Sequence, residues 1–186
     1  MVSKKHSMML DTLLKDAKKQ LVSALIHKKH SFRYFTLTTL SLEGSPHSRT
    51  VVLRGFDPEK FTFSIYTDSR SDKVKELNKD DRAEFLFYDN NQLLQLLVRV
   101  NLIGSISSEE KFNSLSDSYK KDYCATQQPG NPIKGPEDIE YDFDKGYFIE
   151  LNFKAVQIEY LKLKRPNHLR AKFHINQNWK GCFITP

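Results

Sequence analysis

The most constraining feature of this chain is a series of short strand-like runs that follow one another too closely for helices to lie between most of them. Aromatic and β-branched side chains dominate these runs, which cover residues 32–40, 48–56, 61–67, 82–89 and 93–107. Asp57-Pro58-Glu59-Lys60 alone separates the second run from the third. Parallel strands need crossovers of a dozen or more residues, whereas antiparallel strands need only short turns. The spacing therefore predicts an antiparallel, mainly β fold.

Three helical patterns are predicted, one before the first strand run, one between the third and fourth runs, and one after the fifth. Residues 8–28 carry a one-sided apolar stripe, and Ser7 is a candidate N-cap for that helix. A short helix is predicted over 72–78, with Ser71 as its candidate N-cap. The polar segment 108–125 also reads as helical.

The last third of the chain combines a loop with further strands. Residues 126–140 contain Pro129, Gly130, Pro132, Gly135 and Pro136 and predict a loop. Strand patterns resume over 147–163, and 167–186 predict a closing hairpin. Six or seven mostly antiparallel strands with few helices indicate a β-barrel with peripheral helices, formed by one domain over residues 1–186.

Net charge and cysteine content indicate which ligands the protein favours and in which cellular compartment we expect it. The net charge is +6 and the sequence pI about 9.2, which favours anionic partners, but the cations are spread along the chain rather than gathered in one tract. Cys124 and Cys182 are the only cysteines, too few for a disulfide framework. The N-terminus has no continuous apolar region typical of a secretory signal. We expect a cytoplasmic protein without a membrane span.

The segment from Ser48 to Lys73 is the strongest candidate binding site. Its cations and hydroxyls are the groups that hold phosphate: arginine forks, a lysine charge and a serine at the start of a helix, supplied by Arg49, Arg54, Arg70, Ser71 and Lys73. We interpret this segment as a site for a phosphate-bearing ligand. The alternative is that these charges are solvated surface groups.

A second unusual pattern occurs in the strand Gln95–Gly104. Strand alternation puts Gln95, Leu97, Arg99 and Asn101 on one face of a strongly apolar segment. This face either lies at a solvent-exposed edge or donates hydrogen bonds to a planar polar ring. Other site types are not indicated, because the histidines lack metal-site spacing, the glycines form no phosphate loop, and Cys124 has no neighbouring base.

Five segments, in order and spacing, resemble the pyridoxamine 5'-phosphate oxidase-like FMN-binding split barrels. They are Arg49-Thr50-Val51-Val52-Leu53-Arg54, Tyr66-Thr67-Asp68-Ser69-Arg70-Ser71-Asp72-Lys73, Phe85-Leu86-Phe87-Tyr88, the strand ending at Gly104, and Arg170 with Trp179 and Pro186. The resemblance implies a six-stranded split barrel that works as a homodimer, with FMN bound at the dimer interface. It also implies an FMN-dependent oxidoreductase.

The resemblance assigns cofactor-binding roles by motif position. The residues implied along the flavin and ribityl chain are Arg49, Thr50, Val51, Val52, Leu53 and Arg54, with Tyr66 and Thr67 beside it. The residues implied near the phosphate are Arg70, Ser71, Asp72 and Lys73. The resemblance also implies Gln95 or Arg99 at the isoalloxazine edge, and Arg170 reaching the site from the partner subunit. No catalytic residue and no metal ligand is predicted.

The segments that would recognise substrate depart from the family pattern. The oxidases carry a glutamine five residues before the strand glycine, and here that position is Arg99, with Gln95 four residues earlier. Their Arg-Leu-His-x-Arg motif is replaced by Arg165-Pro166-Asn167-His168-Leu169-Arg170. We therefore expect FMN binding with a substrate other than pyridoxamine phosphate. The alternatives are a non-enzymatic flavin binder or sensor, and a basic nucleic-acid-binding barrel in which aromatic residues stack on bases.

Overall fold

A computed structural model describes residues 4–186 of the chain. The elements, in order, are α1 (Lys4–Ile26), β1 (Tyr34–Leu40), β2 (Pro46–Val52), β3 (Gly55–Asp57), β4 (Thr62–Asp68), α2 (Asp72–Lys79), β5 (Arg82–Asp89), β6 (Leu94–Ile106), α3 (Glu109–Ser114), α4 (Asp117–Lys120), β7 (Phe148–Lys162), β8 (Leu169–His174) and β9 (Gly181–Phe183), with short 3-10 turns at Ser31–Arg33, Lys121–Tyr123, Pro136–Asp138 and Ile175–Gln177.

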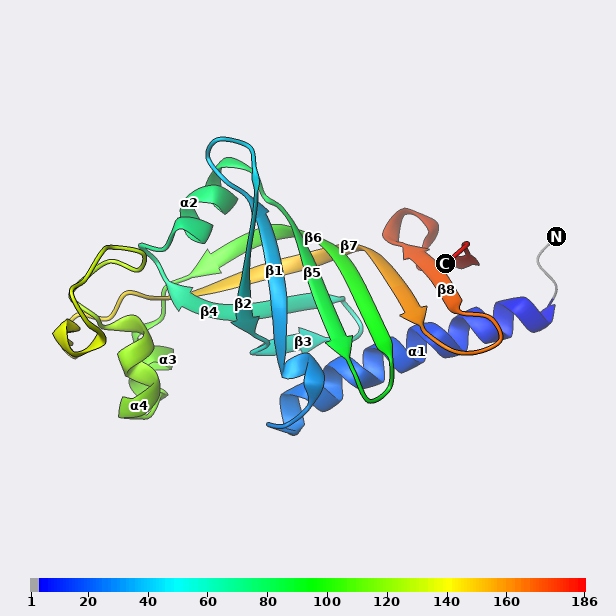
Figure 1. The fold of residues 1–186 in the computed structure, drawn as a ribbon, viewed down its shortest axis with the longest axis horizontal. Coiled ribbons are helices and arrows are strands. Elements are labelled where there is room, and N and C mark those ends of the chain that lie inside the picture. The colour runs from blue at the N-terminus through cyan, green and yellow to red at the C-terminus, as the bar shows by residue number, and fades with distance from the viewer. Residues whose placement is uncertain (1–3) are drawn as a thin grey trace.

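The strands form one antiparallel sheet in the order β2-β1-β5-β6-β7-β4-β3, with the β8–β9 hairpin added beside β7 (Figure 1). The predicted mainly β fold with peripheral helices is confirmed. Nine strands replace the six expected, because the predicted run 48–56 is divided into β2 and β3 and because β8 and β9 lie beyond the barrel. Counting β2 and β3 as one bent segment leaves six barrel strands.

The barrel is closed along only part of its length. β3 pairs with β4, with Gly55 opposite Ser64, and the amide of Arg54 donates to the Ser64 carbonyl over 3.0 Å. β2 precedes this closure and pairs only with β1, so its other edge has no strand neighbour within residues 4–186. A gap, which we call the split, therefore separates β2 from the last residues of β4.

Aromatic side chains from the inward faces of the strands fill the barrel. Phe63, Phe85, Phe87 and Phe153 are completely or almost completely buried, and the ring centroids of Phe85 and Phe153 lie 5.0 Å apart. α1 covers one opening of the barrel with the predicted stripe, of which Leu10, Leu13, Ala17, Leu21 and Ala24 are buried. Ser7 lies inside α1 rather than at its N-cap, because the helix already includes Lys4.

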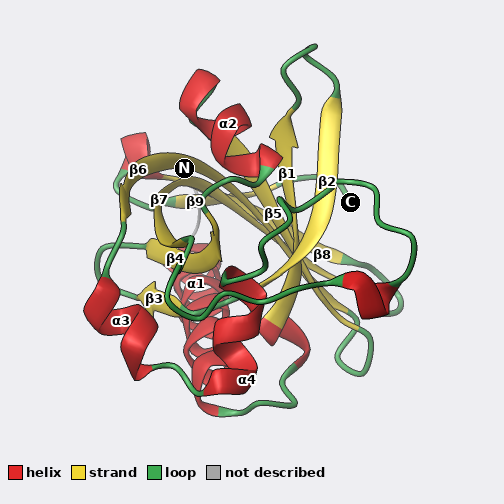
Figure 2. Cartoon of the chain, turned by 90° about the vertical axis from the view of Figure 1, so that its left-hand side faces the viewer, coloured by secondary structure: helices red, strands yellow, loops and turns green. Residues whose placement is uncertain are grey.

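The connection between β6 and β7 gathers at the end of the barrel opposite the chain termini, close to α2 (Figures 1 and 2). It contains α3, α4 and a long loop in which Ala125 and Tyr141 form an isolated bridge. A small second core, made of Phe112, Tyr123, Cys124 and Phe148, holds it against the sheet. The predicted helix over 108–125 is thus three short helical turns.

Candidate functional site

A pocket of about 290 Å³ lies in the split. Three parts of the chain line it: the free edge of β2, the end of β4 with the start of α2, and the β6–β7 connection. The lining residues are Arg49, Thr50, Val51, Val52, Arg54, Tyr66, Thr67, Asp68, Ser71, Lys73, Asp122, Tyr123 and Pro129. The pocket thus brings together residues from both ends of the Ser48–Lys73 segment, which the sequence analysis interpreted as one phosphate site.

Two cations lie close together in this pocket. The Lys73 ammonium donates to Thr67 Oγ1 over 3.0 Å, and burial together with the nearby Arg49 charge lowers the pKa of Lys73 below its ordinary value. The Arg49 side chain is only 17% exposed. Two partly desolvated positive charges facing one cavity favour an anion between them.

The start of α2 adds uncharged donors to the same pocket. Ser71 occupies the N-cap position, and its hydroxyl donates to the Asp68 carbonyl over 2.8 Å instead of capping the helix. The first-turn amides of a helix have no intrahelical acceptor, and the helix dipole is positive at this end. Together with Lys73, this end of α2 suits a phosphate group.

Arg54 also lines the pocket and has a donor without a partner. Its Nε is buried, and among residues 4–186 it is the only such side-chain nitrogen or oxygen without a hydrogen-bond partner. Its guanidinium lies over the rings of Tyr66 and Tyr119, at 5.4 and 5.5 Å from their centroids. Burial raises the pKa of Tyr123, while the Arg54 charge opposes this rise. A buried donor of this kind is available to an acceptor on a ligand or a water molecule.

Arg70 does not line the pocket. It forms a two-pronged ion pair with Asp68, with Nη2 2.7 Å from Oδ2, and stacks 3.3 Å from the centroid of the Tyr147 ring. Its guanidinium also donates to the carbonyls of Ala125 and Thr126. Arg70 therefore fastens the β6–β7 connection to the end of β4.

The other predicted cofactor-binding residues lie elsewhere in this chain. Leu53 is completely buried in the main core, and Asp72 forms an ion pair with Lys75 on the exposed side of α2. Gln95 and Arg99 share the outward face of β6, as predicted, where Arg99 pairs with Glu84 of β5. Arg170 on β8 pairs with Glu159 of its own chain.

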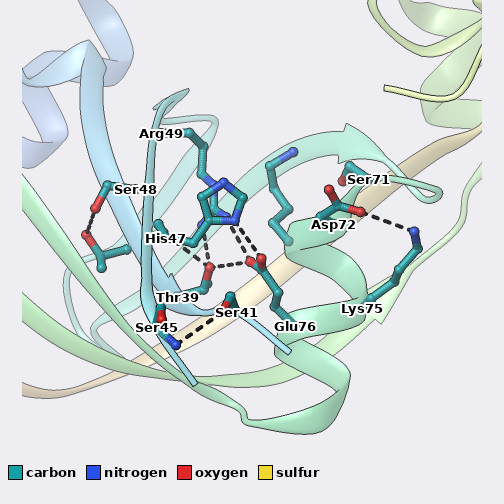
Figure 3. A network of polar contacts seen from close by, with 12 residues as sticks. Thr39, Ser41, Ser45, His47, Ser48, Arg49, Ser71, Asp72, Lys75 and Glu76 are labelled. Carbon is teal, nitrogen blue, oxygen red and sulfur yellow. Dashed lines mark hydrogen bonds and ion pairs between the residues drawn. The ribbon is translucent and has the colours of Figure 1, made fainter. Parts of the chain in front are cut away.

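The structure adds residues that sequence patterns did not identify. Asp122, Tyr123 and Pro129 reach the pocket from the β6–β7 connection, whose path depends on tertiary contacts. Glu76 lies behind the pocket, where Thr39, His47 and Arg49 converge on its carboxylate (Figure 3). The sequence signal for Glu76 is its position three residues after Lys73 in α2, a spacing that makes two helical side chains neighbours.

The pocket contains cations, hydroxyls and aromatic rings, but no paired nucleophile and base. Across residues 4–186 there is also no cluster of histidine, cysteine and carboxylate groups that could hold a metal ion. No helix among these residues is both long and apolar enough to cross a membrane. Binding an anion with an attached ring system is what this arrangement supports.

Comparisons with known proteins agree with this geometry. A family described as pyridoxamine 5'-phosphate oxidase, FMN-binding domain, matches residues 11–103. The chain is 27% identical over 163 residues to pyridoxine/pyridoxamine 5'-phosphate oxidase 2 of Arabidopsis thaliana, covering 80% of this chain and 82% of that protein. It is 29% identical over 155 residues to pyridoxine/pyridoxamine 5'-phosphate oxidase of Cyanothece sp., covering 81% of this chain but only 62% of that protein.

A solved structure is similar over nearly the whole chain. It is a pyridoxamine 5'-phosphate oxidase-related, FMN-binding protein from Nostoc punctiforme, which superposes with a TM-score of 0.71 and is 26% identical. The superposition covers 92% of this chain and 96% of that protein.

Proposed function

The chain belongs to the pyridoxamine 5'-phosphate oxidase FMN-binding family, its cofactor is FMN, and we propose that it is an oxidoreductase that holds the FMN phosphate in the split pocket. The observation that carries this proposal is the pair of partly buried cations, Arg49 and Lys73, beside the N-terminus of α2. A phosphate dianion would be attracted to both cations and would accept hydrogen bonds from the first amides of α2.

The remaining pocket residues suit the rest of the cofactor. Thr50, Val51 and Val52 along the free edge of β2 would lie beside the ribityl chain, and Tyr66 beside the flavin. The unpartnered Nε of Arg54 would donate to an acceptor on the cofactor or on the substrate. When bound, FMN supplies hydride or electron transfer, while the protein supplies binding, orientation and electrostatics.

We further propose that FMN lies between two copies of the chain. A pocket of about 290 Å³ is just below the range of about 300–1,000 Å³ for small-molecule sites, so it suits the phosphate and ribityl parts better than the whole cofactor. The proposed flavin-edge residues, Gln95 and Arg99, lie on an outward face that a second copy would cover. In that arrangement the partner subunit's Arg170 would complete the site.

The physiological substrate is proposed to differ from pyridoxamine phosphate. The family motif for the substrate phosphate is replaced here by Arg165–Arg170, and Arg170 is engaged by Glu159 over 2.5 Å. Tyr123, which lines the pocket, and Tyr119, whose ring lies under the Arg54 guanidinium, instead offer aromatic rings beside Arg54. This combination favours a substrate that has a planar ring but lacks the phosphate of pyridoxamine phosphate.

Comparing FMN with riboflavin tests the proposal, because riboflavin lacks only the phosphate. We expect the purified protein to show flavin absorption and to bind FMN more tightly than riboflavin in fluorescence titrations. Lys73→Ala should weaken FMN binding about tenfold or more, since a hydrogen bond to a charged group contributes roughly 1.5–3 kcal/mol. Lys75→Ala, which removes an exposed lysine of the same helix, is the matched control and should leave the FMN affinity unchanged.

Equal dissociation constants for FMN and riboflavin, or a Lys73→Ala protein that binds FMN normally, would contradict this placement of the phosphate. Steady-state turnover separates an enzyme from a flavin-binding sensor. Reduction of the FMN-loaded protein by NAD(P)H, followed by reoxidation over many cycles, would favour the enzyme.

A further inference from the structure

A buried carboxylate that does not line the split pocket contacts one of its cations. Glu76 is on α2 and only 3% exposed, and both of its oxygens are engaged. Oε1 accepts from His47 Nδ1 over 2.6 Å, whereas Oε2 accepts from Thr39 Oγ1 over 2.6 Å and from Arg49 Nη2 over 2.8 Å. Figure 3 shows these side chains of β1 and β2 converging on one point of the helix.

The contacts to Arg49 fix its direction. Besides the bond from Nη2 to Glu76, Arg49 Nη1 donates to Thr39 Oγ1, so one side of the guanidinium is held by two acceptors that are themselves bonded to each other. An arginine has five N–H donors in a rigid fork. The remaining donors of Arg49 stay available for a ligand in the split pocket, which Arg49 lines.

The charge of Glu76 also suits this role. Arg49 and Lys73 repel each other across the pocket, and Glu76 is the anion in direct contact with that pair, through Arg49. Burial by itself raises the pKa of Glu76, but hydrogen bonds from His47, Thr39 and Arg49 outweigh it and lower the pKa overall. The carboxylate therefore stays ionised at neutral pH and keeps Arg49 beside Lys73.

We propose that Glu76 is a positioning residue for cofactor binding, which acts by orienting Arg49 toward the FMN phosphate. This inference rests on the proposed function of the split pocket. It assigns Glu76 no contact with FMN, because Glu76 does not line the split pocket and reaches it only through Arg49. The competing explanation is that Glu76 only joins α2 to β1 and β2.

The variant Glu76→Gln distinguishes these roles, because it preserves the size of the side chain but removes its charge. We expect the dissociation constant for FMN to rise about tenfold, while that for riboflavin, which has no phosphate to meet Arg49, stays unchanged. Asp89→Asn is the matched control: Asp89 is also a buried carboxylate, but it bonds to Gln92 away from the pocket. This control should bind FMN normally even if it is less stable.

A double-mutant cycle shows whether Glu76 acts through Arg49. In an Arg49→Ala background, Glu76→Gln should cause almost no further loss of FMN affinity. A further tenfold loss in that background, or equal losses for FMN and riboflavin, would overturn the proposal. If Glu76→Gln does not fold, Thr39→Val removes the hydroxyl between Arg49 and Glu76, and an FMN affinity unchanged in that variant would likewise overturn it.

The same variants also distinguish a failure of this inference from a failure of the proposed function on which it rests. Normal FMN binding by Lys73→Ala would contradict the phosphate site itself. Weak binding by Lys73→Ala and normal binding by Glu76→Gln would retain the phosphate site and reject only the positioning role.

Discussion

At the scale of single residues, the pairing of Lys73 with Arg49 is the property that most defines the site. Both cations were visible in the sequence, but their mutual approach depends on β2 and α2 meeting across the split. Burial and the Arg49 charge lower the pKa of Lys73, so this lysine loses its proton at a lower pH than an ordinary lysine does.

This shift predicts a pH dependence of cofactor binding. A phosphate dianion favours protonated Lys73, so FMN affinity should decrease as the pH rises toward the alkaline range, already below the ordinary lysine pKa of 10.5. Fluorescence titrations at several pH values from about 7 upward, with riboflavin as the reference for flavin ionisation, measure the effect. Lys73→Arg stays protonated throughout and should abolish the decrease. Identical profiles for the two proteins would contradict this assignment.

Thr67, Ser71 and Lys73 lie close together because one short segment carries all three, whereas Arg49 reaches them only through the packing of β2 beside α2. Arg70 illustrates where prediction from such a segment fails. Its type and position suit a phosphate ligand, yet the turn after β4 brings it onto Asp68, two residues earlier. Arg82 makes the same contact with Asp80 after α2, so the Asp-x-Arg spacing is the signal that was available.

At the scale of elements, strands with clear turn signals were predicted closely. β5 matches the predicted 82–89, and α2 extends only one residue beyond the predicted 72–78. β7 is more continuous than its sequence pattern suggested. Its register with β6 shifts between Arg99 and Val100 and again between Leu102 and Gly104, and such bulges interrupt simple alternation. Because of these shifts, counting five residues back from Gly104 to Arg99 does not by itself identify the position that corresponds to the glutamine of the oxidases.

The β6–β7 connection could not be predicted, because a tertiary contact determines its path. Arg70→Ala should release it: we expect hydrogen exchange at the amides of Thr126, Asp142 and Tyr147 to accelerate at least tenfold, with the barrel strands unaffected. Arg82→Ala removes the equivalent but exposed ion pair and is the matched control. Unchanged exchange in Arg70→Ala would mean that the small core around Phe148 alone holds the connection.

At the scale of the whole molecule, the outward face of the sheet is apolar where β1, β5 and β6 adjoin. Tyr34, Leu86 and Tyr88 are exposed there, Leu86 lies opposite Leu97, and Tyr88 lies opposite Gln95. Exposed apolar patches of this kind mark interaction surfaces. A second copy of the chain is the proposed occupant, since the same face carries the residues expected at the flavin edge.

Disrupting this face should therefore affect assembly and cofactor binding together. We expect the wild-type protein to behave as a dimer in light scattering, and Leu86→Glu combined with Tyr88→Glu to give a monomer that binds FMN at least tenfold more weakly. Ile133→Glu, at an exposed apolar residue of the β6–β7 connection, should change neither property. A wild-type monomer with tight FMN binding would contradict the proposed interface.

The residues that line the split pocket can change largely independently of the residues that fill the barrel. The pocket and the main core share almost no residues. Among the apolar pocket residues, Val51 packs against the main core, while Tyr66 and Tyr123 belong to the small cluster around Phe148. Substitutions that reshape the pocket thus leave the buried aromatic residues of the barrel untouched. We therefore expect substitutions in the pocket wall to change ligand binding at little cost in the stability of the barrel.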